Sequence, residues 1–130
     1  MNLKTINPWQ WQNNFGYAQA VEITQHQGTL YCAGQAAIDA DGNPVGGSMT
    51  EQVQLSLQNL ETVINKAGYH PAHIIRLNLY TTSIPDFFAA YGTLMAWLQA
   101  HRVTPSCTLV QVEALAYPAL TIEIEATVVR

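Results

Sequence analysis

The first helix of the chain is predicted by its pattern of apolar and polar positions. Ser48 and Glu51 have the spacing of a capping box, in which a serine oxygen and a glutamate carboxylate satisfy the first free amides of a helix. Gly68 marks its end. Between these signals, apolar residues recur at spacings of four, three and four, which places them on one helical face: Val53, Leu57, Leu60 and Ile64.

A second helix is predicted from Pro85 to about His101. The fixed φ of proline suits the first turn of a helix. The same spacing of four, three and four then recurs along the segment, so that one face is again apolar: Phe87, Tyr91, Leu94 and Leu98.

Strands are predicted where β-branched, aromatic and alternating residues gather between turn signals. We expect Tyr17–Thr24 and Thr29–Gly34 to form a hairpin joined by Gln25 to Gly28, because glycine readily takes the positive φ of such a turn. A surface loop at Asp39–Pro44 follows. The other expected strands are Ile74–Thr81, Cys107–Leu115 and, after the break at Tyr117 and Pro118, Leu120–Val129.

The last predicted strand has two unlike faces. Side chains alternate along a strand, so one face is apolar and suits packing under helices, whereas the other is mixed. Together with the element order, this predicts a single α+β domain over residues 1–130, with both helices on one face of a mixed sheet and a partner on the other. The apolar face comprises Leu120, Ile122, Ile124, Ala126 and Val128; the mixed face comprises Thr121, Glu123, Glu125, Thr127 and Val129.

Charge is scarce in this chain and favours a homo-oligomer. Only 11% of its 130 residues are charged, against roughly 25% in an ordinary soluble domain. A small protein with so little charge is expected to bury part of its surface against other subunits. The net charge is −4, and nucleic-acid binding is disfavoured because the basic residues are scattered: Lys4, Lys66, Arg76, Arg102 and Arg130.

The sequence has no membrane-spanning run and no cluster of metal ligands, and both absences shape the expected location and chemistry. No apolar run approaches the roughly 20 residues that span a bilayer, and the N-terminal segment is polar, so a cytoplasmic protein without membrane contact is expected. Cys32 and Cys107 are then expected to be free thiols. His70 and His73 lack a nearby cysteine or carboxylate in sequence, and are read as loop histidines rather than metal ligands.

Five segments, in order, resemble signatures of the Rid (reactive intermediate deaminase) family. The first resembles the family's Gly-Pro-Tyr-Ser-Gln-Ala segment, the second its Ser-Gly-Gln strand end, and the third its helix with Asn59-Leu60. The fourth resembles its strand-to-helix turn and the fifth its closing hairpin. These segments are Phe15–Val21, Leu30–Gln35, Gln52–Gly68, Thr81–Phe87, and Val110–Val112 with Ile122–Ala126.

The resemblance implies a chorismate mutase-like homotrimer whose three sheets face inward, with ligand clefts between neighbouring subunits. Members with deaminase activity hydrolyse reactive enamines and imines to ketones and ammonia, and need no metal or cofactor. The chain is therefore expected to bind a small metabolite in an intersubunit cleft.

The resemblance also assigns site residues, with two departures. The arginine that grips a substrate carboxylate in the deaminases corresponds to Cys107, and a thiol cannot donate that fork of hydrogen bonds. Glu123 corresponds to the glutamate that positions a water for attack on the imine carbon. Tyr17 corresponds to the cleft-wall aromatic, Ala33 with Gly34 to the strand end that lines the floor, and Tyr91 to a family asparagine.

Each assigned residue also has a plainer reading. Glu123 fits a solvated strand glutamate, Tyr17 an interface aromatic, and Tyr91 a core residue on the stripe of the second helix. Cys107 fits a small packed thiol that widens the cleft, rather than a nucleophile, because no histidine or lysine neighbours it in sequence.

Three functions follow in order of preference. The first is hydrolysis of enamines or imines that are larger than the standard 2-imino acids or lack a carboxylate. The alternative is a non-catalytic trimer that binds a small metabolite. A ribonuclease or translation inhibitor ranks last because the chain is acidic. Arg76 or Arg102 of a neighbouring subunit is the candidate replacement for the missing arginine.

Overall fold

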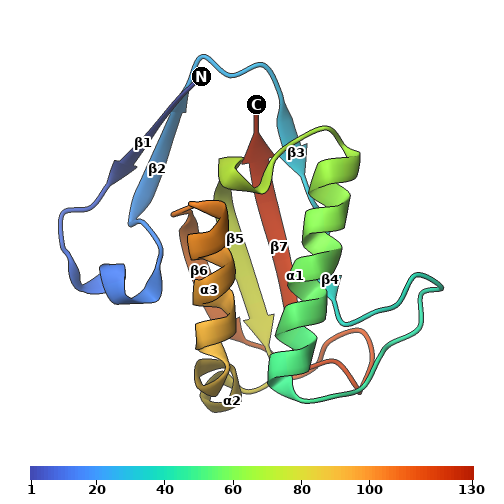
Figure 1. Ribbon diagram of the computed structural model, residues 1–130. Helices are drawn as coiled ribbons and strands as arrows, with labels where there is room; N and C mark the ends of the chain where they lie inside the picture. Colours follow the sequence, from blue (N-terminus) through green and yellow to red (C-terminus); the bar gives the residue numbers. More distant parts are fainter.

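The computed structural model describes residues 1–130 and has a mixed sheet at its centre (Figure 1). Its strand order is β3-β7-β5-β6, and β4 also pairs with β7. Strands β5 and β6 are parallel and the other pairs are antiparallel, which confirms the predicted mixed sheet. The strands are β3 (Thr29–Tyr31), β4 (Gln35–Ala36), β5 (Ile74–Thr81), β6 (Ser106–Gln111) and β7 (Ile122–Val129).

Helix α1 (Met49–Lys66) forms as predicted. The Glu51 amide donates to Ser48 Oγ at 3.2 Å, and the Ser48 amide donates to Glu51 Oε1 at 3.0 Å, so the capping box is complete. Gly68 follows with a left-handed φ of 78°. All four residues of the predicted stripe are buried against the sheet in the main hydrophobic core.

The second predicted helix is two helices: α2 (Ile84–Ala89) and α3 (Tyr91–His101). The backbone of Ala90 leaves the helical region at φ −101° and ψ 3°, and Gly92, a weak helix former, lies two residues later in the first turn of α3. The expectation of one continuous helix was therefore wrong. Phe87, Leu94 and Leu98 nevertheless all reach the core, so both predicted layers are present, with α1 and α3 covering the same face of the sheet (Figure 1).

The predicted N-terminal hairpin does not form, because its two strands pair with other strands. β2 (Ala20–Thr24) pairs with β1 (Asn2–Ile6), a strand that the sequence pattern did not reveal, and β3 pairs with β7. The reason lies at Gly28, whose amide donates to the Arg130 carbonyl at 2.9 Å while the Arg130 amide donates back at 3.0 Å. This exchange holds the segment before β3 against the C-terminus, away from β2.

The closing strands are shorter than predicted and do not form a hairpin. β5 lies between β6 and β7, because residues 112–121 carry the chain past the end of β5. The predicted alternation is confirmed within β7, where Ile122, Ile124, Ala126 and Val128 are buried in the main core on the helix-covered face. Leu120, which precedes the strand, is buried in a separate small cluster. The other face carries Glu123, Glu125 and Thr127, which are half-buried, and no helix of the chain covers it.

A short 3₁₀ helix, η1 (Trp11–Phe15), joins β1 to β2 and packs beside α3. Gln12 is fully buried and its Oε1 accepts from Gln19 Nε2 at 3.2 Å, which ties the segment to the start of β2. Gly16 then turns with φ 77°, and any side chain there would meet Met95 of α3. A second 3₁₀ helix, η2 (Pro71–His73), leads into β5.

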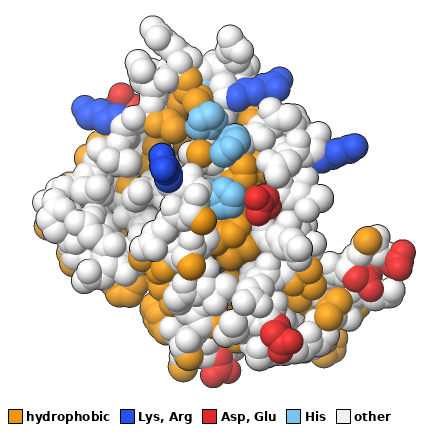
Figure 2. Space-filling model, in the orientation of Figure 1, with side chains coloured by type: hydrophobic (Ala, Val, Ile, Leu, Met, Phe, Trp, Pro, Cys, Tyr) orange, Lys and Arg blue, Asp and Glu red, His pale blue; other side chains and the backbone are white.

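Charged side chains are scattered over the face of the molecule that Figure 2 shows. Lys and Arg side chains stand apart from one another in the upper half of the face shown in Figure 2, while Asp and Glu lie mainly toward its lower right. No helix of the structure has the length and apolarity needed to cross a membrane.

Candidate functional site

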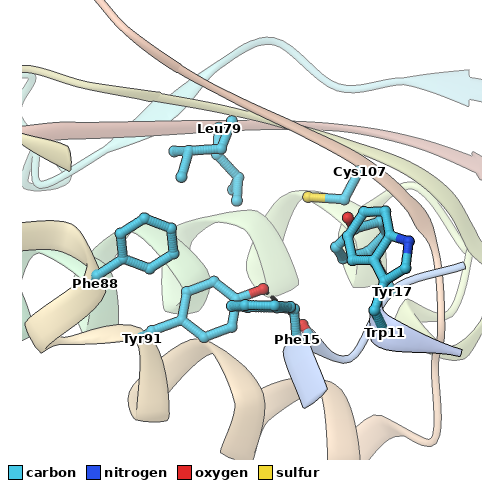
Figure 3. Close-up of a pocket in the computed structure, with 8 residues that line it drawn as sticks. Trp11, Phe15, Tyr17, Leu79, Phe88, Tyr91 and Cys107 are labelled. Atoms are coloured by element: carbon cyan, nitrogen blue, oxygen red, sulfur yellow. Dashed lines mark hydrogen bonds between the residues drawn. The ribbon is translucent and has the colours of Figure 1, made fainter. Parts of the chain in front are cut away.

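A cavity of about 320 Å³ opens between η1, the helices α2 and α3, and the edge of the sheet formed by β5 and β6 (Figure 3). Strand β6 contributes Cys107 and Leu109, whose β5 neighbours in register are Leu77 and Leu79. Cross-strand neighbours project from the same face, so these side chains point toward the helices. Every lining residue is hydrophobic: Trp11, Phe15, Tyr17, Leu79, Phe88, Tyr91, Cys107 and Leu109.

Aromatic rings form most of the cavity wall. The Phe15 ring stands edge-on to the Tyr91 ring with centroids 5.9 Å apart, and the Phe88 ring lies 6.0 Å from Tyr91. On the opposite side, Trp11 packs edge-on to Tyr17 at 6.2 Å. The Tyr91 hydroxyl donates to the Phe15 carbonyl at 2.6 Å, which ties η1 to α3 (Figure 3).

The polar groups that reach the cavity are uncharged at neutral pH. Burial raises the pKa of the Cys107 thiol to about 11, and the more distant Arg76 lowers it only in part. Burial, followed by the proximity of Cys107, raises the pKa of Tyr17. The pKa of Tyr91 is also raised, first by burial and then by Cys107 and Tyr17. The cavity thus holds neutral hydroxyl and thiol groups, and its thiol is not activated as a nucleophile.

The predicted site residues fall into two groups within one chain. Tyr17, Tyr91 and Cys107 meet in the cavity. Glu123 pairs with Tyr80 of β5, one residue out of step with Leu79, so it projects from the opposite, uncovered face of the sheet. The structure therefore does not bring Cys107 and Glu123 together in a single chain.

Ala33 and Gly34 belong to the Glu123 group. They lie between β3 and β4, and the β4 strand pairs Ala36 with Glu123. A Cβ on Gly34 would lie 2.8 Å from Glu123 Cγ and closer still to its carboxylate. The missing side chain at Gly34 is what leaves room for the Glu123 carboxylate.

The two glutamates of β7 have different surroundings. Glu125 Oε1 accepts from Asn78 Nδ2 at 2.9 Å and from the Tyr80 hydroxyl at 2.8 Å. That hydrogen bond is the main cause of the raised pKa of Tyr80. No hydrogen bond or salt bridge within the chain engages Glu123. Glu123 is therefore the carboxylate of this face that remains available to a ligand or water.

Neither candidate arginine lines the cavity of its own chain. Arg76 lies on the uncovered face, where its guanidinium donates to Thr108 Oγ1 at 2.6 Å. Arg102 ends α3 in a left-handed conformation with φ 55° and lines two other depressions, with Val103 and Thr104. Within the chain, no positive charge lines the cavity at Cys107, where the resemblance implies an arginine.

The histidines and cysteines have structural surroundings. His70 Nδ1 accepts from the Ala72 amide at 3.1 Å and caps η2. No group of three or more His, Cys, Asp or Glu side chains is arranged to hold a metal ion. Cys32 is buried in the core and Cys107 is half-buried, and both are free thiols, as predicted.

Sequence reasoning missed five of the eight cavity residues. Leu79 and Leu109 belong to strands and carry no functional signal. The aromatic residues Trp11, Phe15 and Phe88 lie outside any periodic stripe, and their large exposed surfaces become visible only in the folded chain. An unusual density of aromatics between residues 9 and 17 was the one available hint.

Comparison with known proteins places these features in a family. The model of the endoribonuclease L-PSP family matches residues 12–130. The chain is 40% identical over 73 residues to the mitochondrial protein Mmf2 of Schizosaccharomyces pombe, a match that covers 56% of this chain and 55% of Mmf2. The chain thus spans about half the length of that relative. Because that relative is named as mitochondrial, the expected cytoplasmic location stays a prediction.

Two further relatives match over most of their length. The 2-iminobutanoate/2-iminopropanoate deaminase of Salmonella typhimurium is 27% identical over 115 residues, covering 88% of this chain and 87% of the enzyme. The crystal structure of YyfB from Yersinia pestis, a protein of the conserved Rid family, superimposes with a TM-score of 0.87 at 37% identity and covers both chains completely.

Proposed function

The chain belongs to the endoribonuclease L-PSP family, which includes the Rid proteins, and from that premise we propose that it hydrolyses imines or enamines that need no carboxylate for recognition. The reaction takes place in a cleft between neighbouring subunits of a homotrimer. One observation carries the proposal: each chain has two incomplete half-sites on opposite faces of one sheet. The first is the cavity at Cys107, and the second is the free carboxylate of Glu123 beside Gly34.

An intersubunit cleft explains this separation. The cavity of one subunit would supply Tyr17, Tyr91 and Cys107, and the uncovered face of the next would supply Glu123. A chorismate mutase-like trimer with inward-facing sheets is the assembly that the family resemblance implies. The low charge of the chain and the uncovered sheet face support it.

In this cleft Glu123 orients a water and accepts its proton as the water oxygen bonds to the imine carbon. The proton passes to the nitrogen, which gives a neutral carbinolamine. Glu123 then moves the hydroxyl proton of this intermediate to the nitrogen, and the carbon–nitrogen bond breaks as the carbonyl forms and ammonia leaves. No residue has to be alkylated, which agrees with a Cys107 thiol that stays protonated at neutral pH.

The test is ammonia release from imines generated in solution, measured with and without the protein. We expect a neutral imine to be consumed faster than in buffer, and Glu123→Gln to lower the protein-dependent rate about 100-fold, in the range typical of general acid–base catalysis. Glu125→Gln is the matched control, because that residue lies on the same strand face but is bonded to Asn78 and Tyr80. Equal rates for wild type and Glu123→Gln would exclude this role.

A binding protein without turnover is the second candidate. It is favoured by one observation: the cavity is lined by hydrophobic residues only, and its pKa-raised thiol and hydroxyls provide no acid or base near neutrality. A ligand that stays intact after long incubation in the cleft would support this candidate. Rapid conversion of that ligand would exclude it.

A further inference from the structure

The cavity at Cys107 offers a ligand aromatic rings and neutral polar groups, but no charge. We propose that it selects an uncharged aromatic ligand: a ketone or imine that carries an aromatic ring and no carboxylate. This inference deepens the function proposed above and rests on it for the identity of the reacting carbon. The binding of the ring itself does not depend on catalysis.

The size and shape of the cavity fit an aromatic ring with a short chain. Its volume of about 320 Å³ exceeds the roughly 150 Å³ of an apolar cavity that binds benzene. The rings of Phe15, Phe88 and Tyr91 surround one side with centroids about 6 Å apart and tilted planes. Such a wall accepts another ring in an edge-on or offset arrangement, the geometries that aromatic pairs prefer.

The polar groups of the cavity suit a carbonyl or imine rather than an anion. The Tyr91 hydroxyl is already committed to the Phe15 carbonyl. This leaves the Tyr17 hydroxyl and the Cys107 thiol as neutral hydrogen-bond donors. A carboxylate placed here would lose its hydration without gaining a counter-charge, because Arg76 and Arg102 both lie elsewhere. The cavity therefore disfavours the carboxylate that an arginine at this position would attract.

Trp11 and Phe15 are the specificity-determining residues. Both belong to η1, which is held in place by the Tyr91 hydrogen bond, by the buried Gln12 and by the close approach of Gly16 to Met95. The wall is thus built before a ligand arrives, which lowers the entropy that binding would otherwise lose.

Isothermal titration calorimetry with two probes tests the proposal on the full-length protein. Benzylacetone carries a phenyl ring and a neutral methyl ketone; 2-oxo-4-phenylbutanoate differs only in having a carboxylate in place of the methyl group. We expect benzylacetone to bind at least about tenfold more tightly, since an unpaired carboxylate in an apolar site is strongly disfavoured. Cys107→Arg should reverse this order.

Substitutions in the wall give a second, independent readout. Trp11→Ala should weaken benzylacetone binding by about 3- to 10-fold, the range of one aromatic pair contact. Trp9→Ala is the matched control, because Trp9 is similarly exposed, at 58% against 56% for Trp11, and does not line the cavity. Neither exposed tryptophan belongs to the core, so the secondary structure measured by far-UV circular dichroism should be unchanged.

Each outcome bears on the proposal. Equal affinity for the two probes, tighter binding of the oxo acid by the wild type, or no effect of Trp11→Ala would overturn it. Absence of binding by either probe, as when a second copy of the chain fills the cavity, would also overturn it. If benzylacetone binds as expected but no imine is hydrolysed, the proposed ligand selectivity stands and the proposed hydrolase function fails. If imines are hydrolysed but neutral ligands are not preferred, the hydrolase function stands and the selectivity fails.

Discussion

Among single residues, Cys107 has the largest effect on the chemistry of the cavity. The family resemblance implies an arginine at this position; the thiol found there is small and neutral, and it leaves this part of the cavity open and uncharged. The thiol lies among Tyr17, Tyr91 and Leu109, and the charge of Arg76, on the other face of the sheet, offsets the effect of burial on its pKa only in part. A reactive cysteine needs the opposite surroundings, namely a nearby positive charge and access to water.

The pKa of about 11 predicts slow and steeply pH-dependent alkylation of Cys107. The thiolate is the reactive form, and only about one thiol in a thousand is ionised at pH 8, so the rate should be low there and rise roughly tenfold per pH unit until the pKa is approached. Mass spectrometry of iodoacetamide labelling in a Cys32→Ser background measures this directly. Rapid labelling at neutral pH, with a midpoint at or below the ordinary thiol pKa, would contradict the buried environment.

Gly34 affects the proposed site by leaving room for the side chain of Glu123. In Gly34→Ala the added methyl group overlaps the Glu123 side chain, whose flexible end can move aside. We therefore expect Glu123 to be displaced and imine hydrolysis to fall about as far as in Glu123→Gln, with little change in the free energy of unfolding. Gly46→Ala, where a methyl group meets open space, is the control. Kinetics combined with urea unfolding separates the two effects; a large stability loss with normal turnover would contradict this explanation.

At the level of elements, α1 depends on its capping box. Ser48→Ala removes the acceptor for the Glu51 amide and should destabilise the fold by about 1 kcal/mol at pH 7, measured by urea unfolding. The hydrogen bonds from Ser48 hold the pKa of Glu51 below its ordinary value of 4.5. The contribution of Glu51 is thus present above pH 4.5 and lost as the pH falls through its lower folded-state pKa.

Glu51→Gln tests that pH dependence. The stability difference between wild type and Glu51→Gln should be constant near neutrality and shrink as the solution is acidified below pH 4.5. A difference that grows on acidification would contradict the assignment. Glu22→Gln, on the exposed face of β2, is a control that should show no such trend.

Elements defined by local signals were the ones that the sequence predicted well. α1 has a cap, a stripe and a terminal glycine within 21 residues, and β5 is rich in β-branched and aromatic residues between the predicted bounds. Pairing is decided by distant segments instead. The exchange between Gly28 and Arg130 and the insertion of β5 between β6 and β7 have no local signature, so both predicted hairpins failed.

The candidate site was likewise predicted only in part. Family resemblance located Tyr17, Tyr91 and Cys107, which the fold does bring into one cavity. The alternation of the last strand did place Glu123 on the face away from the helices, as the structure has it. Neither the pattern nor the resemblance showed that Cys107, on β6, projects from the other face of the sheet. Trp11 and Phe15 were missed because exposed aromatics produce no periodic signal, and the cavity exists only once η1 meets α3 across more than 70 residues of sequence.

At the level of the whole molecule, the uncovered sheet face requires explanation. It combines a free carboxylate at Glu123 with exposed apolar groups, including Tyr31 at 80% exposure. One chain has no element left to cover it, since α1 and α3 both lie on the other side of the sheet (Figure 1). A trimer with inward-facing sheets would bury these groups and, in the same step, bring Glu123 toward the cavity of a neighbour.

If the chain forms that trimer, one charged substitution on the uncovered sheet face should separate the subunits. Val110 projects from the uncovered face of β6, beside Tyr80, and is 39% exposed. Burying an unpaired carboxylate in an interface is costly, so Val110→Asp should dissociate the trimer and abolish imine hydrolysis, because each chain alone has only half of the site.

Val45→Asp, at 40% exposure in a loop, is the matched control and should leave the mass unchanged. Light scattering after size exclusion should give three times the 14.3 kDa chain for wild type and Val45→Asp, and the single-chain mass for Val110→Asp; a monomeric wild type with full activity would contradict the shared cleft.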